Sequence, residues 1–182
     1  FVSSPQDLKG LRIRIMHKEI MERYFKLMGA TPVMAGYSDI YPMLKKGIID
    51  SQENPHANFL AMKFYEYQPY VSEWSLSYGT GCLVTTPAAL KKLSEHQQHI
   101  VYTAIQEVKE WYKHFLTKFN EDSKYTLITQ HGVSVFPIGK QPLDLWRASA
   151  KPLYDDYPDQ ELLKRIWVEK RRYYEKKSHS SV

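Results

Sequence analysis

The chain has 182 residues, of which 43% are hydrophobic and 14% aromatic, and its formal net charge is +5. This length suits one ordinary domain or one and a half small ones, and the hydrophobic content can fill a core, so global disorder is not expected. The modest positive charge would steer an acidic ligand, but no RNA-stacking motif or zinc-finger spacing accompanies it, so no nucleic-acid partner is expected. No apolar run approaches the roughly 18–20 residues that span a bilayer.

The first half of the chain alternates short apolar runs with amphipathic stretches, a pattern that predicts strands and helices in turn and therefore a parallel α/β sheet. Turn and cap residues mark the ends of these elements: Gly29 closes the first helix, Ser38 is the N-cap of the second and Pro55 opens the third. The expected elements are a strand at 11–15 with one packed face, a helix at 19–28, a strand at 31–35, a helix at 38–46, a very short strand at 48–49 and a helix from 55 to about 67.

The second half has a mostly helical pattern. Between residues 88 and 131 there is neither Gly nor Pro, and apolar residues recur at helical spacing, so we expect one long helix or two abutting ones that Gly132 ends. Around this helix, the expected elements are an extended region from 70 to 85, a strand at 133–136 and two helices near 142–154 and 159–174.

Arg14 is a candidate ligand-binding residue on the first predicted strand, where its neighbours Ile13 and Ile15 face the opposite side. A guanidinium group matches a carboxylate with two parallel hydrogen bonds, which a lysine cannot do. Arg12 shares the face of Arg14, however, and from the residues alone either arginine could be a solvated edge charge.

Asn54 lies in a polar turn before Pro55, where its amide could donate to an anion beside the N–H groups of a helix start. An ordinary N-cap is the alternative, because Asn is a favoured capping residue. Tyr37, next to Ser38, could pack on a ligand or form a hydrophobic staple across the helix start. Tyr78 flanks the later extended segment and is a further candidate for the cleft.

Motifs for catalysis or metal binding are not found in the sequence. There is no G-x-S-x-G elbow, Walker loop, dinucleotide fingerprint or H-E-x-x-H helix, so an enzyme is not expected. His96 and His99 lie three apart on the long predicted helix, but no carboxylate cluster accompanies them, and we interpret them as exposed histidines rather than metal ligands. The single cysteine, Cys82, excludes an intrachain disulfide and is expected to be a buried thiol within its apolar run.

Four short motifs carry a family resemblance: Asp7–Arg14 (DLKGLRIR), Tyr37–Tyr41 (YSDIY), the turn Gly47–Pro55 with Gln52–Pro55 (QENP), and Lys63–Glu66 (KFYE). Together they resemble the DctP-like solute-binding proteins of tripartite ATP-independent periplasmic (TRAP) transporters. In that family the last Arg of the first motif clamps the substrate carboxylate and the Asn of the Gln-Glu-Asn-Pro motif reaches the ligand, which implies these roles for Arg14 and Asn54. An aromatic residue that packs on the ligand is usual at the position of Tyr37.

The resemblance implies an α/β fold of the periplasmic-binding-protein type (type II-like), in which two lobes with parallel-rich mixed sheets flanked by helices close on a ligand. Residues 1–78 correspond to the ligand-binding lobe, which is the second lobe of the family fold. Residues 79–182 correspond to a return strand, a long spanning helix and C-terminal helices of the other, incomplete lobe. The chain corresponds to roughly the last 60% of a family member, so the N-terminal lobe is expected to be largely absent. The sequence starts at Phe1 and contains no signal-peptide pattern, as we expect of a mature chain or an excised piece.

The implied function is that of an extracytoplasmic, periplasmic receptor that captures an organic acid and delivers it to a TRAP membrane permease, without a cofactor. Dicarboxylates, sugar acids, sialic-acid-like compounds and 2-oxo acids all carry the carboxylate that Arg14 would hold, and the sequence does not choose among them. Two alternatives stay open: a truncated relative that acts as an interaction or structural domain without ligand transport, and an enzyme on the same scaffold. A fragment with an exposed lobe interface could also pair as a homodimer.

Overall fold

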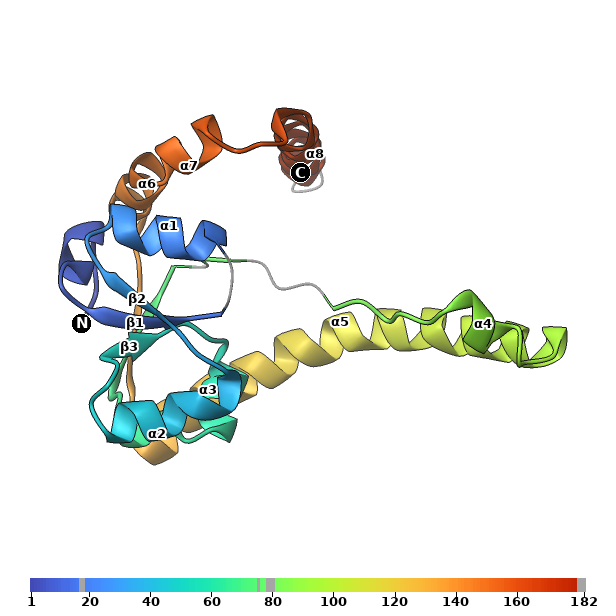
Figure 1. Cartoon of the computed structure of the whole chain (residues 1–182), viewed down its shortest axis with the longest axis horizontal. Helices are drawn as coiled ribbons and strands as arrows, with labels where there is room; N and C mark the ends of the chain where they lie inside the picture. Colours follow the sequence, from blue (N-terminus) through green and yellow to red (C-terminus); the bar gives the residue numbers. More distant parts are fainter. Residues whose placement is uncertain (17–18, 75, 78–80, 180–182) are drawn as a thin grey trace.

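The computed structural model describes residues 1–16, 19–74, 76–77 and 81–179 of the chain. Its first half is built on a three-stranded parallel sheet with helices on both faces (Figure 1). The strands follow the order β2-β1-β3, and their bounds are Arg12–Ile15 for β1, Thr31–Met34 for β2 and Ser51–Gln52 for β3. The predicted alternation of strands and helices around a parallel sheet is therefore confirmed for this half.

The central strand β1 is covered on both faces. Ile13 and Ile15 are 3% and 0% exposed, and Arg14 between them is only 2% exposed. The prediction of a single packed face was wrong for these residues, because the helices of a parallel sheet cover both of its sides. Arg12, at the start of the strand, remains exposed. Of the two arginines, Arg14 is the buried one.

Two hydrophobic cores flank the sheet. The first includes side chains of the 3-10 turn η1 (Pro5–Leu8) and of the helix α1 (Glu19–Leu27). Its members are Leu8, Ile13, Ile15, Tyr24, Phe25, Met28, Ala30, Trp146, Ala150 and Leu153. The second consists of Ile40, Leu44, Ile49, Phe59, Phe64, Leu127 and Val133. Because successive side chains of a strand point to opposite faces, Arg14 points away from the first core.

The second predicted helix begins later than expected. A 3-10 turn, η2 (Tyr37–Asp39), precedes α2 (Ile40–Lys45), so Ser38 is not the N-cap. The Asp39 carboxylate instead accepts a hydrogen bond from the Gly36 N–H at 3.1 Å. This local bond favours the tighter turn before the helix.

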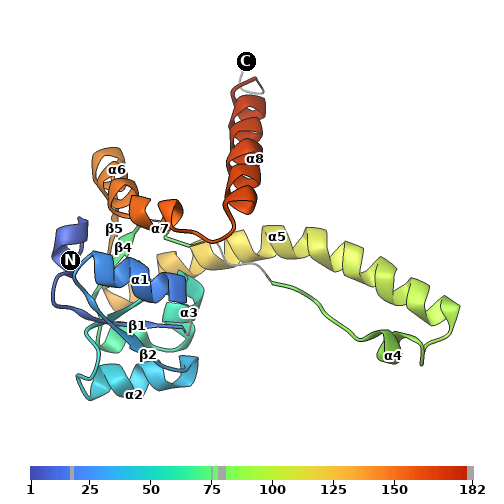
Figure 2. The ribbon, with the colours of Figure 1, turned by 45° about the horizontal axis from the view of Figure 1, so that its top comes forward.

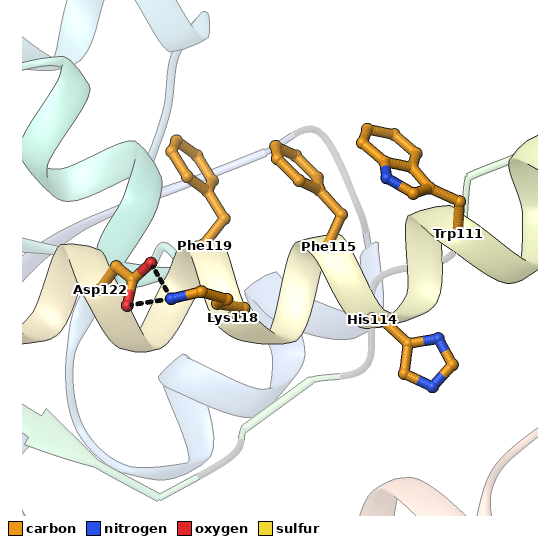
Figure 3. A pocket seen from close by; sticks show the side chains of 6 residues that line it. All are labelled: Trp111, His114, Phe115, Lys118, Phe119 and Asp122. Carbon is orange, nitrogen blue, oxygen red and sulfur yellow. Dashed lines mark hydrogen bonds and ion pairs between the residues drawn. The ribbon is translucent and has the colours of Figure 1, made fainter.

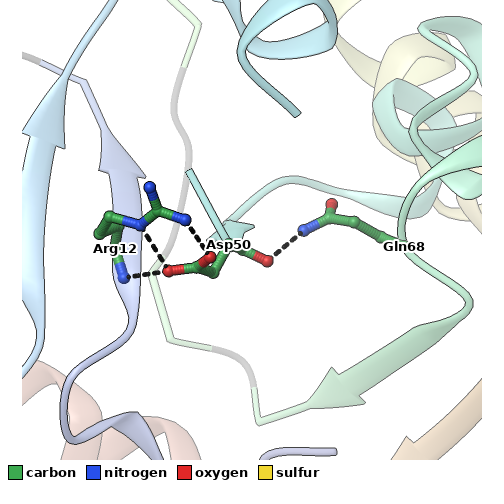
Figure 4. A network of polar contacts seen from close by, with 3 residues as sticks. All are labelled: Arg12, Asp50 and Gln68. Atoms are coloured by element: carbon green, nitrogen blue, oxygen red, sulfur yellow. Dashed lines mark hydrogen bonds and ion pairs between the residues drawn. The ribbon is translucent and has the colours of Figure 1, made fainter. Parts of the chain in front are cut away.

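β3 is held beside β1 by an ion pair between Arg12 and Asp50 (Figure 4). The Arg12 guanidinium donates from Nε to Oδ2 at 2.9 Å and from Nη2 to Oδ1 at 2.6 Å, and the Arg12 N–H donates to Oδ2 at 2.8 Å. In return, the Asp50 N–H donates to the Arg12 carbonyl oxygen at 2.8 Å. The predicted strand at 48–49 was wrong, because these contacts start the ladder at Ser51 and leave Ile49 to the second core.

The helix α3 (His56–Ala61) begins after Pro55, as predicted, but ends early. Lys63 has a φ of +55°, in the left-handed region that favours glycine, and the 3-10 turn η3 (Phe64–Glu66) follows it. The predicted helix is therefore broken in its middle. The break brings Phe64, which is fully buried, into the second core.

A second sheet contains two parallel strands from distant parts of the sequence, β4 (Tyr70–Glu73) and β5 (Ser134–Pro137). In the described part of the chain both sheets are wholly parallel, whereas a parallel-rich mixed sheet was expected. The remaining helices are α4 (Pro87–Leu90), α5 (Glu95–His131), α6 (Lys140–Ser149), α7 (Lys151–Asp155) and α8 (Gln160–His179).

α5 is the longest of the described helices and confirms the prediction of a long helix before Gly132. The Ser94 hydroxyl accepts from the Gln97 N–H at 3.3 Å, and Gly132, with a φ of +67°, lets the chain turn at the other end. Its C-terminal part packs on the second core through the fully buried Leu127. Its first turns extend away from both sheets (Figures 1 and 2). Among the described helices, none combines the length and the apolar character needed to cross a membrane.

The segment Cys82–Val84, before α4, is exposed to solvent. Cys82 is exposed, and Leu83 and Val84 are 80% and 84% exposed. The prediction of a buried thiol was wrong, because this apolar run joins no strand ladder and packs against neither core.

A polar cluster that the sequence did not predict fixes α5 to α3 and β4. The Asn120 Oδ1 accepts from the Ala57 N–H at 3.2 Å, and Lys124 Nζ donates to Glu73 Oε2 at 2.8 Å. His56 Nε2 lies 3.3 Å from the other Glu73 oxygen, and burial lowers the pKa of this histidine. The attachment of α5 is therefore polar as well as apolar.

Replacing Leu127 with Ala should lower the free energy of unfolding by about 2–5 kcal/mol, because it leaves a cavity in the second core. Leu116, on the same helix and 43% exposed, offers a matched control, and Leu116→Ala should change that free energy by less than about 0.5 kcal/mol. Urea denaturation followed by circular dichroism measures both variants. Equal losses would contradict the burial of Leu127.

The Arg12–Asp50 pair predicts an acid-sensitive part of the stability. Hydrogen bonds from Arg12 hold the pKa of Asp50 below its ordinary value. The pair therefore stabilises the fold above the ordinary carboxyl pKa of about 4, and this contribution is lost as the pH falls through the lowered value. Asp50→Asn should be less stable than the wild type near neutral pH, and the difference should shrink in acid. Thermal unfolding between about pH 7 and pH 3 measures it; a difference independent of pH would argue against the pair.

Candidate ligand-binding site

Arg14 lies at the centre of the candidate site. It is near the carboxyl end of β1, and its Nε donates at 3.0 Å to the carbonyl oxygen of Ala35, just past the end of β2. The carboxyl ends of adjacent parallel strands form the edge at which α/β proteins place ligands. The bond to Ala35 fixes the guanidinium at this edge and uses one of its five N–H donors.

Arg14 carries a buried positive charge. Burial lowers the pKa of its guanidinium, the nearby negative charges of Glu53 and Asp39 act against this, and a guanidinium stays protonated in proteins. Within the described part of the chain, no carboxylate lies close enough to Arg14 to form an ion pair. Because buried charges are normally paired, this environment has the chemistry of an anion receptor.

The predicted site residue Tyr37 lies close enough to Arg14 for their charges to interact. Burial raises the pKa of the Tyr37 hydroxyl, and the positive charge of Arg14 acts in the opposite direction. The ring is 40% exposed and packs edge-on against Phe64, with 6.3 Å between ring centroids. Tyr37 therefore offers a partly exposed aromatic surface beside the arginine, and its contact with a ligand stays a prediction.

Asn54 does not cap α3, so the alternative interpretation as an N-cap was wrong. The N-cap residue is Pro55, and Asn54 instead belongs to a chain of side-chain amides. Its Nδ2 donates to Gln52 Oε1 at 2.5 Å, and its Oδ1 accepts from Asn58 Nδ2 at 3.3 Å. Gln52 lies opposite Arg14 in the ladder, so Asn54 comes two residues after β3 meets the arginine. A direct role in ligand binding stays a prediction.

The remaining residues singled out in the sequence are Tyr78, His96 and His99. Tyr78 lies outside the described residues. His96 and His99 are exposed, as predicted. Over the described ranges, no group of three or more His, Cys, Asp or Glu side chains could hold a metal ion.

Three aromatic rings of the long helix lie on the outside of α5 (Figure 3). Trp111, Phe115 and Phe119 stack in series, with ring centroids 4.6 Å and 5.5 Å apart, and are 59%, 41% and 46% exposed. We call these residues the aromatic ladder. Together with His114, Lys118 and Asp122 they line a shallow pocket on the helix. Their spacing of four residues was visible in the sequence, but spacing alone does not tell whether another element covers the face.

Comparison with known proteins identifies relatives for most of the chain. Residues 2–160 match the family described as "Bacterial extracellular solute-binding protein, family 7" (DctP). The C4-dicarboxylate-binding protein DctB of Bacillus subtilis is 26% identical over 156 residues, which cover 86% of this chain and 45% of that protein. The sialic acid-binding periplasmic protein SiaP of Vibrio cholerae is 27% identical over 157 residues, which cover 86% of this chain and 47% of that protein.

A solved TRAP periplasmic solute-binding protein from Sulfitobacter, with bound β-D-galacturonate, has the same fold over the matched part. The TM-score is 0.79 at 22% identity, covering 86% of this chain and 51% of that one. The chain thus spans about half the length of the relatives that it matches. These relatives are solute-binding proteins rather than enzymes, and the DctP-like resemblance of the sequence motifs is confirmed. Since the family match runs through nearly all of it, the chain belongs to the family 7 bacterial extracellular solute-binding proteins of the DctP type.

Proposed function

We propose that this chain is the arginine-bearing part of an extracytoplasmic receptor that captures an organic acid for a TRAP-type transporter. The observation that carries the proposal is the buried guanidinium of Arg14, oriented by the Ala35 carbonyl and without an ion-pair partner among the described residues. A ligand carboxylate supplies the charge and the acceptors that such a group needs. In this role the receptor, located in the periplasm, delivers the acid to the membrane permease.

The orientation of Arg14 defines how a carboxylate binds. Since Nε donates to the Ala35 carbonyl oxygen, the two Nη groups form the side of the guanidinium that meets the ligand oxygens. Tyr37 packs against the ligand next to this contact, Asn54 donates a further hydrogen bond to it, and Tyr78 is the fourth contact that we propose. A lysine in place of Arg14 would keep the charge but lose the paired geometry.

The ligand class follows from what the relatives bind. A C4-dicarboxylate, a sialic acid and galacturonate differ in size and hydroxyl pattern but share a carboxylate. The shared group is the one that Arg14 can recognise. These relatives favour an organic-acid receptor over the alternative of a purely structural domain, and succinate, sialic acid and galacturonate are the probes of choice.

The two parts of the chain take different places in this receptor. Residues 1–78 supply the arginine-bearing wall of the cleft, and within residues 79–182 the helix α5 spans to the other lobe. Because the relatives are about twice as long, we propose that their remaining half corresponds to a lobe that packs on the aromatic ladder. Closure of that lobe would cover the bound acid and remove the water that screens its charge.

Titration of the isotope-labelled chain with succinate, sialic acid and galacturonate, followed by NMR chemical shifts, tests the proposal and detects binding as weak as millimolar. At least one acid should shift the resonances of Arg14 and its neighbours. Arg14→Lys should weaken that binding roughly tenfold to hundredfold, because hydrogen bonds to a charged group are lost.

Arg23→Lys is the matched control, since Arg23 is an arginine of α1 that already binds Asp156 in an ion pair and has no role in the proposed site. It should leave the affinity within about twofold of the wild type. No shift with any of the acids, or equal losses in the two lysine variants, would refute the assignment of Arg14.

A further inference from the structure

Four side-chain amides form one continuous hydrogen-bonded chain beside the candidate site. Gln68 Nε2 donates to the Asp50 carbonyl oxygen at 3.3 Å, and Gln52 Nε2 donates to Gln68 Oε1 at 3.1 Å. Asn54 Nδ2 then donates to Gln52 Oε1, and Asn58 Nδ2 donates to Asn54 Oδ1. We call Gln68, Gln52, Asn54 and Asn58 the amide chain. All four side chains are half-buried.

One contact decides the direction of the whole amide chain. A main-chain carbonyl oxygen only accepts hydrogen bonds, so the Gln68 amide must turn its NH2 group toward Asp50 and its oxygen toward Gln52. Gln52 must then donate to Gln68 and accept from Asn54. The Asn54 amide is therefore fixed with its NH2 group toward Gln52 and its oxygen toward Asn58. Each orientation follows from the previous one, without knowledge of any hydrogen position.

The start of the amide chain is itself held in place. Asp50, whose carbonyl oxygen receives the Gln68 bond, is fixed by the two guanidinium bonds and the N–H bond from Arg12 (Figure 4). The main-chain N–H of Gln68 donates to the Phe64 carbonyl oxygen at 3.0 Å, which anchors this residue to the η3 turn. The direction of the Asn54 amide is thus determined by contacts at the start of β3, whereas Asn54 itself follows the end of that strand.

We propose that Gln68 is a positioning residue that fixes the donor side of Asn54 for a ligand oxygen. Asn54 uses one N–H on Gln52 and accepts one hydrogen bond from Asn58, so a second N–H of its Nδ2 is the donor that remains. A carboxylate or hydroxyl oxygen of an organic acid is the matching acceptor. Without Gln68, the Gln52 and Asn54 amides can turn over, and the Asn54 oxygen would then repel a carboxylate. The ligand contact rests on the proposed function, whereas the fixed amide orientation does not.

The first arm of the test needs no ligand. In the full chain, solvent exchange of the side-chain amide protons of Gln52 and Asn54 is measured by NMR for the wild type and for Gln68→Met, which keeps the length of the side chain but neither donates nor accepts strongly. Gln68→Met should speed the exchange of both amides roughly fivefold, as expected for the loss of one hydrogen bond. Gln68→Glu, which can still accept from Gln52, should keep the exchange of the Gln52 amide near the wild-type rate.

Gln160→Met is the matched control, because Gln160 also donates to main-chain carbonyl oxygens but lies at the start of α8. It should leave the exchange of Gln52 and Asn54 unchanged. If Gln68→Met leaves both exchange rates at their wild-type values, or if the control raises them as much, the amide chain does not fix Asn54 and the proposal is overturned.

The second arm is the titration with succinate, sialic acid and galacturonate. Gln68→Met should weaken binding of the acid that the wild type binds by roughly fivefold, while Gln160→Met should not change it. Faster exchange without weaker binding would overturn the positioning role while leaving the receptor function intact. If the wild type binds none of the acids, the receptor function and the ligand contact of Asn54 both fail, and the exchange rates still decide the orientation of the amide.

Discussion

The burial of one arginine in a central strand is the constraint on which the candidate site depends. A guanidinium inside a protein is unfavourable unless acceptors and negative charge compensate for its lost hydration. Here the Ala35 carbonyl supplies one acceptor, and Glu53 and Asp39 supply a negative potential from a distance. The sheet can keep this charge because β1 lies between two strands and is covered by helices, which fix the side chain in one place. In the function that we propose, a ligand that completes the set of acceptors meets a group that needs no rearrangement.

Arg12 and Arg14 show how position along one strand separates a structural role from the binding role that we propose. Both belong to β1 and, being two residues apart, have side chains on the same face of the strand. Arg12 is at the amino end of the strand, where Asp50 satisfies its guanidinium in two parallel bonds and ties β3 to the sheet. Arg14, two residues on, lies toward the carboxyl end, where the turns after β2 and β3 converge. The first arginine stabilises the edge of the sheet at which, as we propose, the second one binds a ligand.

The sequence predicted the order of the elements well. The spacing of the apolar residues indicates whether a segment is a strand or a helix, and residues such as Gly29 and Gly132 mark where a helix ends. The sequence located the candidate residues on the correct elements, since Arg14 lies on β1 and Asn54 follows β3. It misplaced β3, because the ladder is set by the long-range pair between Arg12 and Asp50 and not by the local run of isoleucines. The amide chain could not be predicted either, as its members are brought together only by the fold.

The break at Lys63 and the exposure of Cys82 have a related explanation. The left-handed backbone conformation of Lys63 cannot be recognised in the local sequence, because the tertiary packing of Phe64 enforces it. An apolar run such as Cys82–Val84 predicts burial only if another element is available to cover it.

The length of α5 has a mechanical consequence. At 1.5 Å per residue, its 37 residues form a rod of about 55 Å, which is attached to the body near one end. A small change of angle at the attachment, where Leu127 and Lys124 bind the body, becomes a displacement of many ångströms at the free end. The rigidity of this attachment therefore matters more than the rigidity of α5 itself. The contacts around His56 and Glu73 limit how far the free end of the helix can move relative to the two sheets.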